Sequence, residues 1–188
     1  NKVPHIELNW ISPAEVQVPE DFRKRLDAPE IVLQTLIRRG LKDYDSAIRF
    51  IDPTRYIPAS ASDLPDLNKG VQRLAEAVHS GSTIGVWGDF DVDGQTATSV
   101  LVSALRQIGA NVKYHIPLRV TESHGIKLDA LKDFLVEGVN VLLTCDTGIT
   151  AHESISYAQS RGVDVVVTDH HLLPAVLPPA YALINPRR

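Results

Sequence analysis

The sequence predicts an α/β fold in which a mostly parallel sheet is flanked by helices. Short runs of β-branched and apolar residues alternate with longer amphipathic stretches over most of the chain. Strands joined by helices of this length need right-handed crossovers, which produce a parallel sheet covered on both faces. With 188 residues and a hydrophobic content of 44%, the chain can bury one substantial core.

A short helical leader is expected before the alternating part of the chain. In residues 29–50 the apolar side chains recur at helical spacing, and Gly40 divides them into two short helices. Residues 52–65 have the proline and serine content of a linker, and residues 67–80 show a further amphipathic helical pattern before a glycine. We therefore expect residues 1–81 to form a helical leader and linker.

The α/β domain is expected to span residues 82–188. Within it, β-type runs of four to six residues are separated by helical patterns that end at glycines. The expected strands are residues 83–87, 111–116, 139–144, 163–168 and 181–184, and the expected helices are residues 96–108, 128–136 and 151–159.

Carboxylates and histidines follow three of these expected strands. Ligands of parallel α/β sheets bind beyond the carboxyl ends of the strands, so side chains at these ends share one edge. Three aspartates at alternate positions would repel one another by several kcal/mol at low effective dielectric unless a cation neutralised them. Asp89, Asp91 and Asp93 follow the first strand, Asp146 follows the third, and Asp169, His170 and His171 follow the fourth.

The residue types at this edge favour Mn²⁺ or Mg²⁺, because hard carboxylate oxygens with one imidazole suit these ions. Zinc is less favoured, since the only cysteine, Cys145, lies in an apolar strand where it is typical of core. Taken alone, Asp93 or Asp146 would be interpreted as a helix cap and the two histidines as loop residues. Their collection at one sheet edge favours a metal centre.

Two other kinds of site are not supported. Residues 89–94 begin like a calcium-binding EF-hand loop, but its twelfth position is Val100 where a bidentate glutamate is needed, and a strand precedes it where a helix is needed. The glycines at 85, 88 and 94 fit neither a dinucleotide fingerprint nor a phosphate-binding loop.

Composition sets weaker limits. A net charge of -4 and a pI of about 6.0 argue against a dominant basic surface, although carboxylates that bind cations lower the formal charge. One cysteine allows no internal disulfide, which suits the reducing cytoplasm. No apolar run approaches the roughly 20 residues of a membrane span, so we expect a cytoplasmic protein that does not cross a membrane.

Three motifs together resemble the RecJ branch of the DHH phosphoesterase superfamily. Residues 88–94 resemble its motif I, residues 144–149 its motif II, and residues 167–171 the motif that names the superfamily. Residues 116–119, 124–126 and 177–187 and the leader at 29–50 extend the resemblance over nearly the whole chain. The leader is the reason to prefer this branch to the smaller DHH phosphatases.

The resemblance implies a metal-dependent exonuclease that degrades single-stranded DNA from 5′ to 3′ in repair and recombination, with DNA-repair proteins as partners. It also implies two Mn²⁺ or Mg²⁺ ions, which lower the pKa of a water molecule and neutralise the phosphate. By the same resemblance, Asp89 and Asp91 hold one ion, Asp93 and His170 hold the other, and Asp146 bridges them. His171 then faces the phosphate and Asp169 orients its neighbour. Arg119 and His124 are the candidate substrate contacts, with a solvated surface arginine as the equally weighted alternative for Arg119.

The resemblance further implies a fourth aspartate motif and a DHHA1 domain beyond residue 188, so we expect this piece to fold but to be weakly active. Two alternatives stay open. A small DHH phosphodiesterase acting on oligoribonucleotides or cyclic dinucleotides would lack the leader. A DHH-derived scaffold that only binds DNA or other proteins would be expected to have lost some of the metal ligands.

Overall fold

The computed structural model describes residue 9 and residues 11–188, which form two compact units. One unit extends through Ala59 and the other is Ser60–Arg188. The boundary falls inside the segment that the sequence predicts as a linker. Among the described residues, no helix is both long enough and apolar enough to cross a membrane.

The described part of the first unit contains three short helices, α1 (Glu20–Arg25), α2 (Glu30–Arg38) and α3 (Tyr44–Ile51). The two helices divided by Gly40 are present as α2 and α3, whereas α1 was not predicted. It has only six residues and is mostly charged, so it carries no apolar period. Its single buried residue contributes to the small core of this unit, which consists of Val18, Phe22, Leu26, Leu33, Leu36 and Ala47.

The segment predicted as a linker contains two single turns of 3-10 helix, η1 (Pro53–Arg55) at the end of the first unit and η2 (Ala61–Asp63) at the start of the second. After it, α4 (Leu67–Ser80) packs on the sheet of the second unit. Gly70 allows this approach, because a Cβ at this position would lie 3.0 Å from Ile184 Cδ1 and 3.1 Å from Val166 Cγ1. The expected division at residue 81 groups α4 with the leader, while its packing places it with the sheet.

The second unit is built on a five-stranded sheet in the order β2-β1-β3-β4-β5. Every neighbouring pair is parallel, which confirms the predicted α/β class. The carboxyl ends of all five strands therefore lie along one edge of the sheet. The strands are β1 (Thr83–Trp87), β2 (Asn111–His115), β3 (Val141–Cys145), β4 (Asp164–Thr168) and β5 (Ala182–Ile184).

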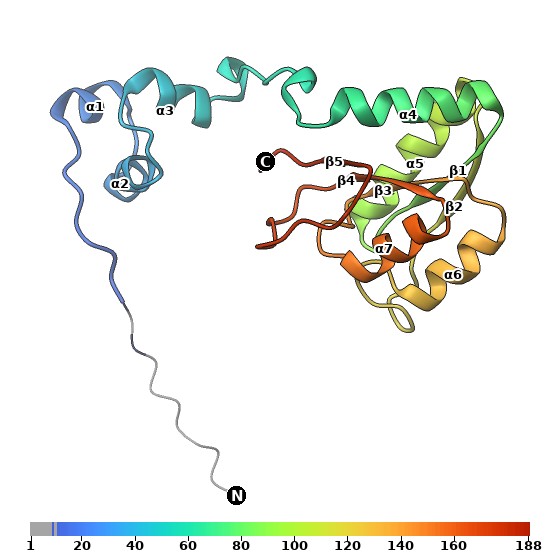
Figure 1. Ribbon diagram of the computed structural model, residues 1–188. Coiled ribbons are helices and arrows are strands. Elements are labelled where there is room, and N and C mark those ends of the chain that lie inside the picture. The colour runs from blue at the N-terminus through green and yellow to red at the C-terminus, as the bar shows by residue number, and fades with distance from the viewer. Residues whose placement is uncertain (1–8, 10) are drawn as a thin grey trace, which may run out of the picture. The chain divides into compact units, whose positions relative to one another are not determined.

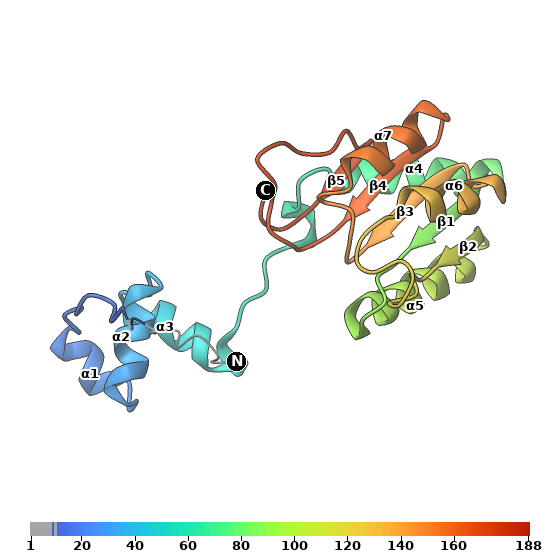
Figure 2. The same cartoon turned by 90° about the horizontal axis from the view of Figure 1, so that it is seen from below.

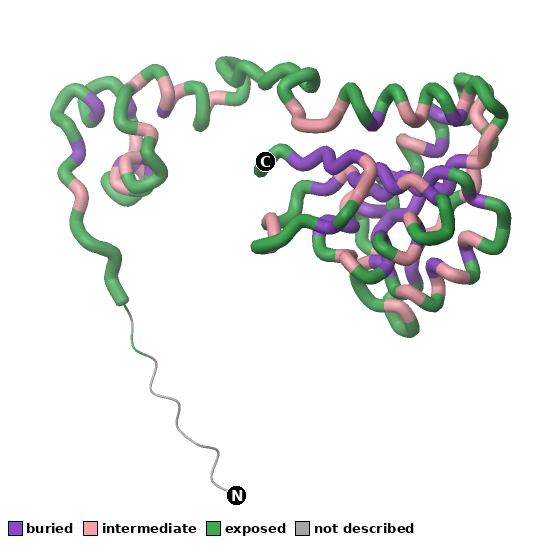
Figure 3. Tube along the Cα trace, viewed as in Figure 1, coloured by how far each residue is buried: buried purple, intermediate pink, exposed green. Residues whose placement is uncertain are grey.

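Helices cover both faces of this sheet (Figures 1 and 2). The residues of α4 and α5 (Val92–Gln107) pack against one side of the central strands. Those of α6 (Leu128–Val136) and α7 (His152–Ser160) pack against the other side. Both faces of β3 are therefore buried, and Figure 3 shows that buried residues lie along the strands. This rigid core fixes the positions of the loops that follow β1, β3 and β4.

The start of α5 differs from the prediction in a way that affects the site. The sequence predicts this helix from Thr96, but it begins at Val92 because the Asp91 side chain caps it. Asp91 Oδ1 accepts a hydrogen bond from Gly94 N at 3.0 Å. Asp93 consequently lies in the first turn of the helix and not in a loop, where a negative charge also interacts favourably with the helix dipole.

Candidate metal centre

The loop after β1 holds Asp89 in a buried position. Its Oδ1 accepts from Phe90 N at 2.7 Å, and its Oδ2 lies 3.1 Å from His124 Nδ1. The residue is only 5% exposed. The fixed carboxylate and the exposed His124 ring thus join the loop after β1 to the loop that follows β2.

Gly94 allows the tight turn that places Asp89 and Asp91. A Cβ at Gly94 would lie 2.5 Å from both the N and the O of Asp89 and 2.6 Å from its Cα. These are backbone atoms, so they cannot move away as the end of a flexible side chain could.

We therefore expect Gly94→Ala to destabilise the protein by about 1–3 kcal/mol, the usual cost of overpacking. Urea denaturation would measure the loss. Ser103→Ala, on the exposed side of the same helix, is the matched control and should not lower the free energy of unfolding, since alanine is a better helix former than serine. Equal midpoints for Gly94→Ala and the control would show that the loop after β1 is not closely packed.

The loop after β3 begins with Asp146 in the left-handed region, with φ of 60°. Its backbone N donates to Thr168 O at 3.1 Å, which ties this turn to the end of β4. Burial raises the pKa of the Asp146 carboxyl, the hydrogen bond from His170 opposes this shift, and the negative charge of Asp91 adds to it. A partly desolvated carboxylate near a second one is a suitable site for a cation.

Asp169 is the most constrained residue of the site, with its side chain only 1% exposed. Its Oδ1 accepts from His170 N at 2.7 Å and from His171 N at 3.0 Å. The same oxygen lies 2.7 Å from His171 Nδ1, and this hydrogen bond raises the pKa of His171. Oδ2 accepts from Ile149 N at 2.9 Å. Asp169 therefore connects the loops after β3 and β4 and leaves His171 Nε2 for other partners.

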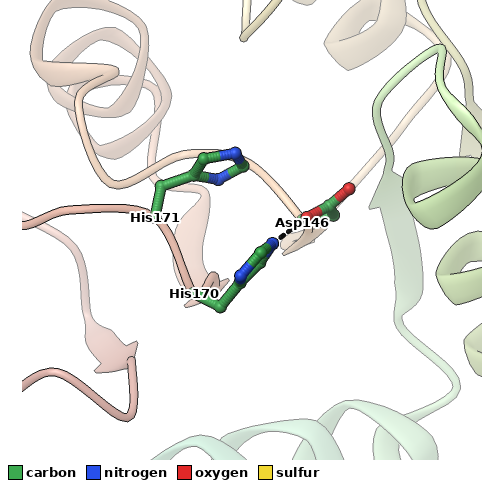
Figure 4. A group of neighbouring side chains, drawn as sticks. All are labelled: Asp146, His170 and His171. Atoms are coloured by element: carbon green, nitrogen blue, oxygen red, sulfur yellow. Dashed lines mark hydrogen bonds and ion pairs between the residues drawn. The ribbon is translucent and has the colours of Figure 1, made fainter. Parts of the chain in front are cut away.

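Asp146, His170 and His171 converge at the sheet edge (Figure 4). One potential ligand atom from each lies within 4.8 Å of the other two. His170 Nε2 is 2.8 Å from Asp146 Oδ1, and the two imidazole ring centroids are 4.7 Å apart. A carboxylate oxygen and an imidazole nitrogen at this spacing suit a divalent transition metal such as Mn²⁺, and a second imidazole lies beside them.

The aspartates after β1 surround this cluster without joining it, since none of them belongs to the 4.8 Å group among the described residues. Asp93 shares an open cavity of about 660 Å³ with Asp146 and His170. Asp89 shares an adjoining cavity of about 440 Å³ with Asp146 and His171. Asp146 lines both cavities and, because β3 lies between β1 and β4 in the sheet, it lies between the carboxylates after β1 and the histidines after β4.

The two predicted substrate contacts lie beside Phe90, on the loop after β1. The ring centroids of His124 and Phe90 are 4.3 Å apart, and the guanidinium carbon of Arg119 lies 5.3 Å from the Phe90 centroid. Arg119 also lines a cavity of about 620 Å³ together with Asp91. Phe90 has no role among the predicted site residues, although its place between two aspartates could have pointed to one.

The DHH family, N-terminal domain, matches residues 83–188. The chain belongs to the DHH family. This match covers more than half of the chain and contains all three motifs, so the resemblance seen in the sequence is confirmed.

Several relatives of this DHH chain are RecJ proteins. It is 36% identical to the single-stranded-DNA-specific exonuclease RecJ of Haemophilus influenzae over 72% of its length, and 30% identical to that of Bacillus subtilis over 97%. It covers only 24% and 23% of these two proteins. A crystal structure of exonuclease RecJ bound to manganese matches 69% of the chain and 33% of that structure, with a TM-score of 0.64 and 36% identity. The chain is thus homologous to the N-terminal region of RecJ.

Proposed function

We propose that this chain is the catalytic DHH domain of a metal-dependent phosphodiesterase that degrades single-stranded DNA from the 5′ end. The observation that carries the proposal is the convergence of Asp146, His170 and His171 at the carboxyl edge of the sheet. The RecJ relatives are named as single-stranded-DNA-specific exonucleases, which supports this choice of substrate. Roles in repair and recombination, DNA-repair proteins as partners and a cytoplasmic location belong to the same proposal.

The residues at the sheet edge are suited to hold two Mn²⁺ or Mg²⁺ ions. Manganese in the structure of the RecJ neighbour favours Mn²⁺. When bound, the ions lower the pKa of a water molecule and neutralise negative charge on the phosphate. In our assignment Asp89 and Asp91 hold one ion, Asp93 and His170 hold the other, and Asp146 lies between both groups.

Substrate contacts are assigned to side chains around this centre. Asp169 holds His171 Nδ1 and thereby presents Nε2, which we assign to the phosphate. Arg119 has a planar guanidinium suited to a second phosphate oxygen, and His124 borders the cavity that contains Asp89. The aromatic ring of Phe90 between them offers a surface on which a base can stack.

Mn²⁺ should stabilise the protein against unfolding, because an ion that binds only the native state shifts the equilibrium by mass action. At about 100 times the dissociation constant the gain is about 2.7 kcal/mol. Thermal melts with and without Mn²⁺ measure it. Asp133→Asn, an exposed residue of α6, should keep the full shift. An unchanged midpoint at millimolar Mn²⁺ in the unmodified chain would contradict the metal centre.

Hydrolysis assays would test the proposed reaction directly. We expect Mn²⁺-dependent release of mononucleotides from a 5′-phosphorylated single strand, with slower cleavage of the same sequence in a duplex. Hydrolysis of a small phosphodiester, which needs no DNA-binding groove, would measure the bond-breaking activity by itself. A cyclic dinucleotide cleaved faster than any single strand would favour a small-substrate phosphodiesterase instead. Complete lack of metal-dependent hydrolysis of every substrate, with Mn²⁺ bound, would favour a scaffold.

A further inference from the structure

Residues 169–171, here called the DHH segment, are held from the side of β5 as well as by Asp169. Asn185 follows β5 directly and is completely buried. Its Nδ2 donates to His171 O at 3.1 Å, and its Oδ1 accepts from Arg187 N at 2.8 Å. Since the oxygen faces a donor and the nitrogen faces an acceptor, the orientation of the amide is fixed by its two partners.

Arg187 makes the second contact from this side. Its Nε donates to the backbone oxygen of His170 at 2.8 Å. The hydrogen bond from Arg187 N to Asn185 holds the backbone from which this side chain extends. The next residue, Arg188, points elsewhere, since it bonds Asp66 Oδ2 at 2.7 Å and the backbone oxygen of Leu183.

The backbone N–H groups and the carbonyl oxygens of His170 and His171 are therefore bound by different residues. The Asp169 carboxylate accepts from the backbone N–H groups of His170 and His171. Asn185 and Arg187 donate to the carbonyl oxygens of these same two histidines. With both N–H groups and both carbonyl oxygens engaged, the peptide planes at the histidines have little freedom to rotate, and this fixes the backbone positions from which their imidazoles extend.

We propose that Asn185 and Arg187 are positioning residues that orient His170 and His171 for metal and phosphate binding. The role of the two histidines rests on the proposed function, whereas the restraint on their backbone does not. Residues that orient the ligands of a metal typically change metal affinity by about 10–100-fold when they are replaced.

Two substitutions remove these contacts in different ways. Asn185→Asp keeps the shape and the bond from Arg187 N but places a carboxylate oxygen against His171 O, where a donor is required. Arg187→Met keeps much of the length and loses the Nε donor. Because Arg187 is exposed, its replacement should leave the fold intact. The Arg187 variant would therefore still test the proposal if the Asn185 variant failed to fold.

The test uses the full 188-residue chain and two measurements. Without metal, hydrogen exchange by NMR should show faster exchange of the His170 and His171 amides in both variants. With metal, calorimetry should show Mn²⁺ binding weakened by about 10–100-fold. Arg187→Lys, which retains a donor, should recover part of the affinity.

Arg188→Met is the matched control, because it removes an arginine from the same chain end without touching the DHH segment. It should lower stability while leaving the exchange of the two amides and the Mn²⁺ affinity unchanged. Wild-type exchange rates in both Asn185→Asp and Arg187→Met would overturn the inference. Faster exchange in a chain whose unmodified form binds no Mn²⁺ would support the inference and contradict the proposed metal centre.

Discussion

Replacing Asp146 by asparagine should abolish Mn²⁺-dependent hydrolysis while leaving the protein folded. Asp146 lines both cavities of the site and lies 2.8 Å from His170 Nε2, so its charge is central to any cation held there. Losing several kcal/mol of electrostatic stabilisation of the transition state corresponds to a rate lower by about a thousandfold.

Asparagine is the right substitution at this position for two reasons. The left-handed backbone of Asp146 is tolerated best by Asn, Asp and Gly, so alanine would add strain unrelated to charge. The amide oxygen can still accept from His170, while the repulsion from Asp91 that raises the pKa of this carboxyl disappears. The melting temperature without metal should therefore not fall.

Single-turnover hydrolysis of a small phosphodiester, with calorimetry of Mn²⁺ binding, would measure the effect. Asp129→Asn is a suitable control, because this exposed aspartate of α6 forms an ion pair with Lys132 and lies outside the cavities of the site. Hydrolysis by Asp146→Asn within tenfold of the unmodified chain would refute the assigned role of Asp146.

Sequence periodicity was sufficient to predict the fold, because strand patterns and helix patterns alternate regularly along the chain. Residues 128–136 have one apolar face and end before a glycine, and α6 has these bounds. The beginning of α5 was harder to predict, since residues 92–95 carry no apolar period and their helical state depends on the side chain of Asp91. A boundary set by a single capping hydrogen bond is not visible in a hydrophobic pattern.

The site was predictable to the level of the sheet edge but not to the level of individual contacts. The strand pattern predicted that Asp146, His170 and His171 share one edge, because the carboxyl ends of neighbouring parallel strands lie side by side at one edge of the sheet. It could not show that Asn185, which follows β5, contacts His171. Such a contact depends on how the short strand β5 is aligned with β4 and on the rotamers of both side chains, and local sequence indicates neither.

Asp169→Asn should lower the free energy of unfolding by about 3 kcal/mol. The carboxylate accepts four hydrogen bonds, three at Oδ1 and one at Oδ2 from Ile149 N. An amide of the same shape must turn its NH₂ group toward one of these sets of donors. A buried donor left unpaired costs about 1–3 kcal/mol, and the charge-assisted character of the bonds is also lost.

Urea denaturation of Asp169→Asn beside Asp133→Asn would measure this difference, since the control removes a charge from an exposed helix position. Under conditions in which both site variants are folded, Asp169→Asn should keep more hydrolytic activity than Asp146→Asn. The reason is that Asp169 acts by orienting His171 and joining two loops, whereas Asp146 offers its own charge to the cation. A reversed order of activity would mean that the buried carboxylate of Asp169, and not that of Asp146, is the group required at the metal.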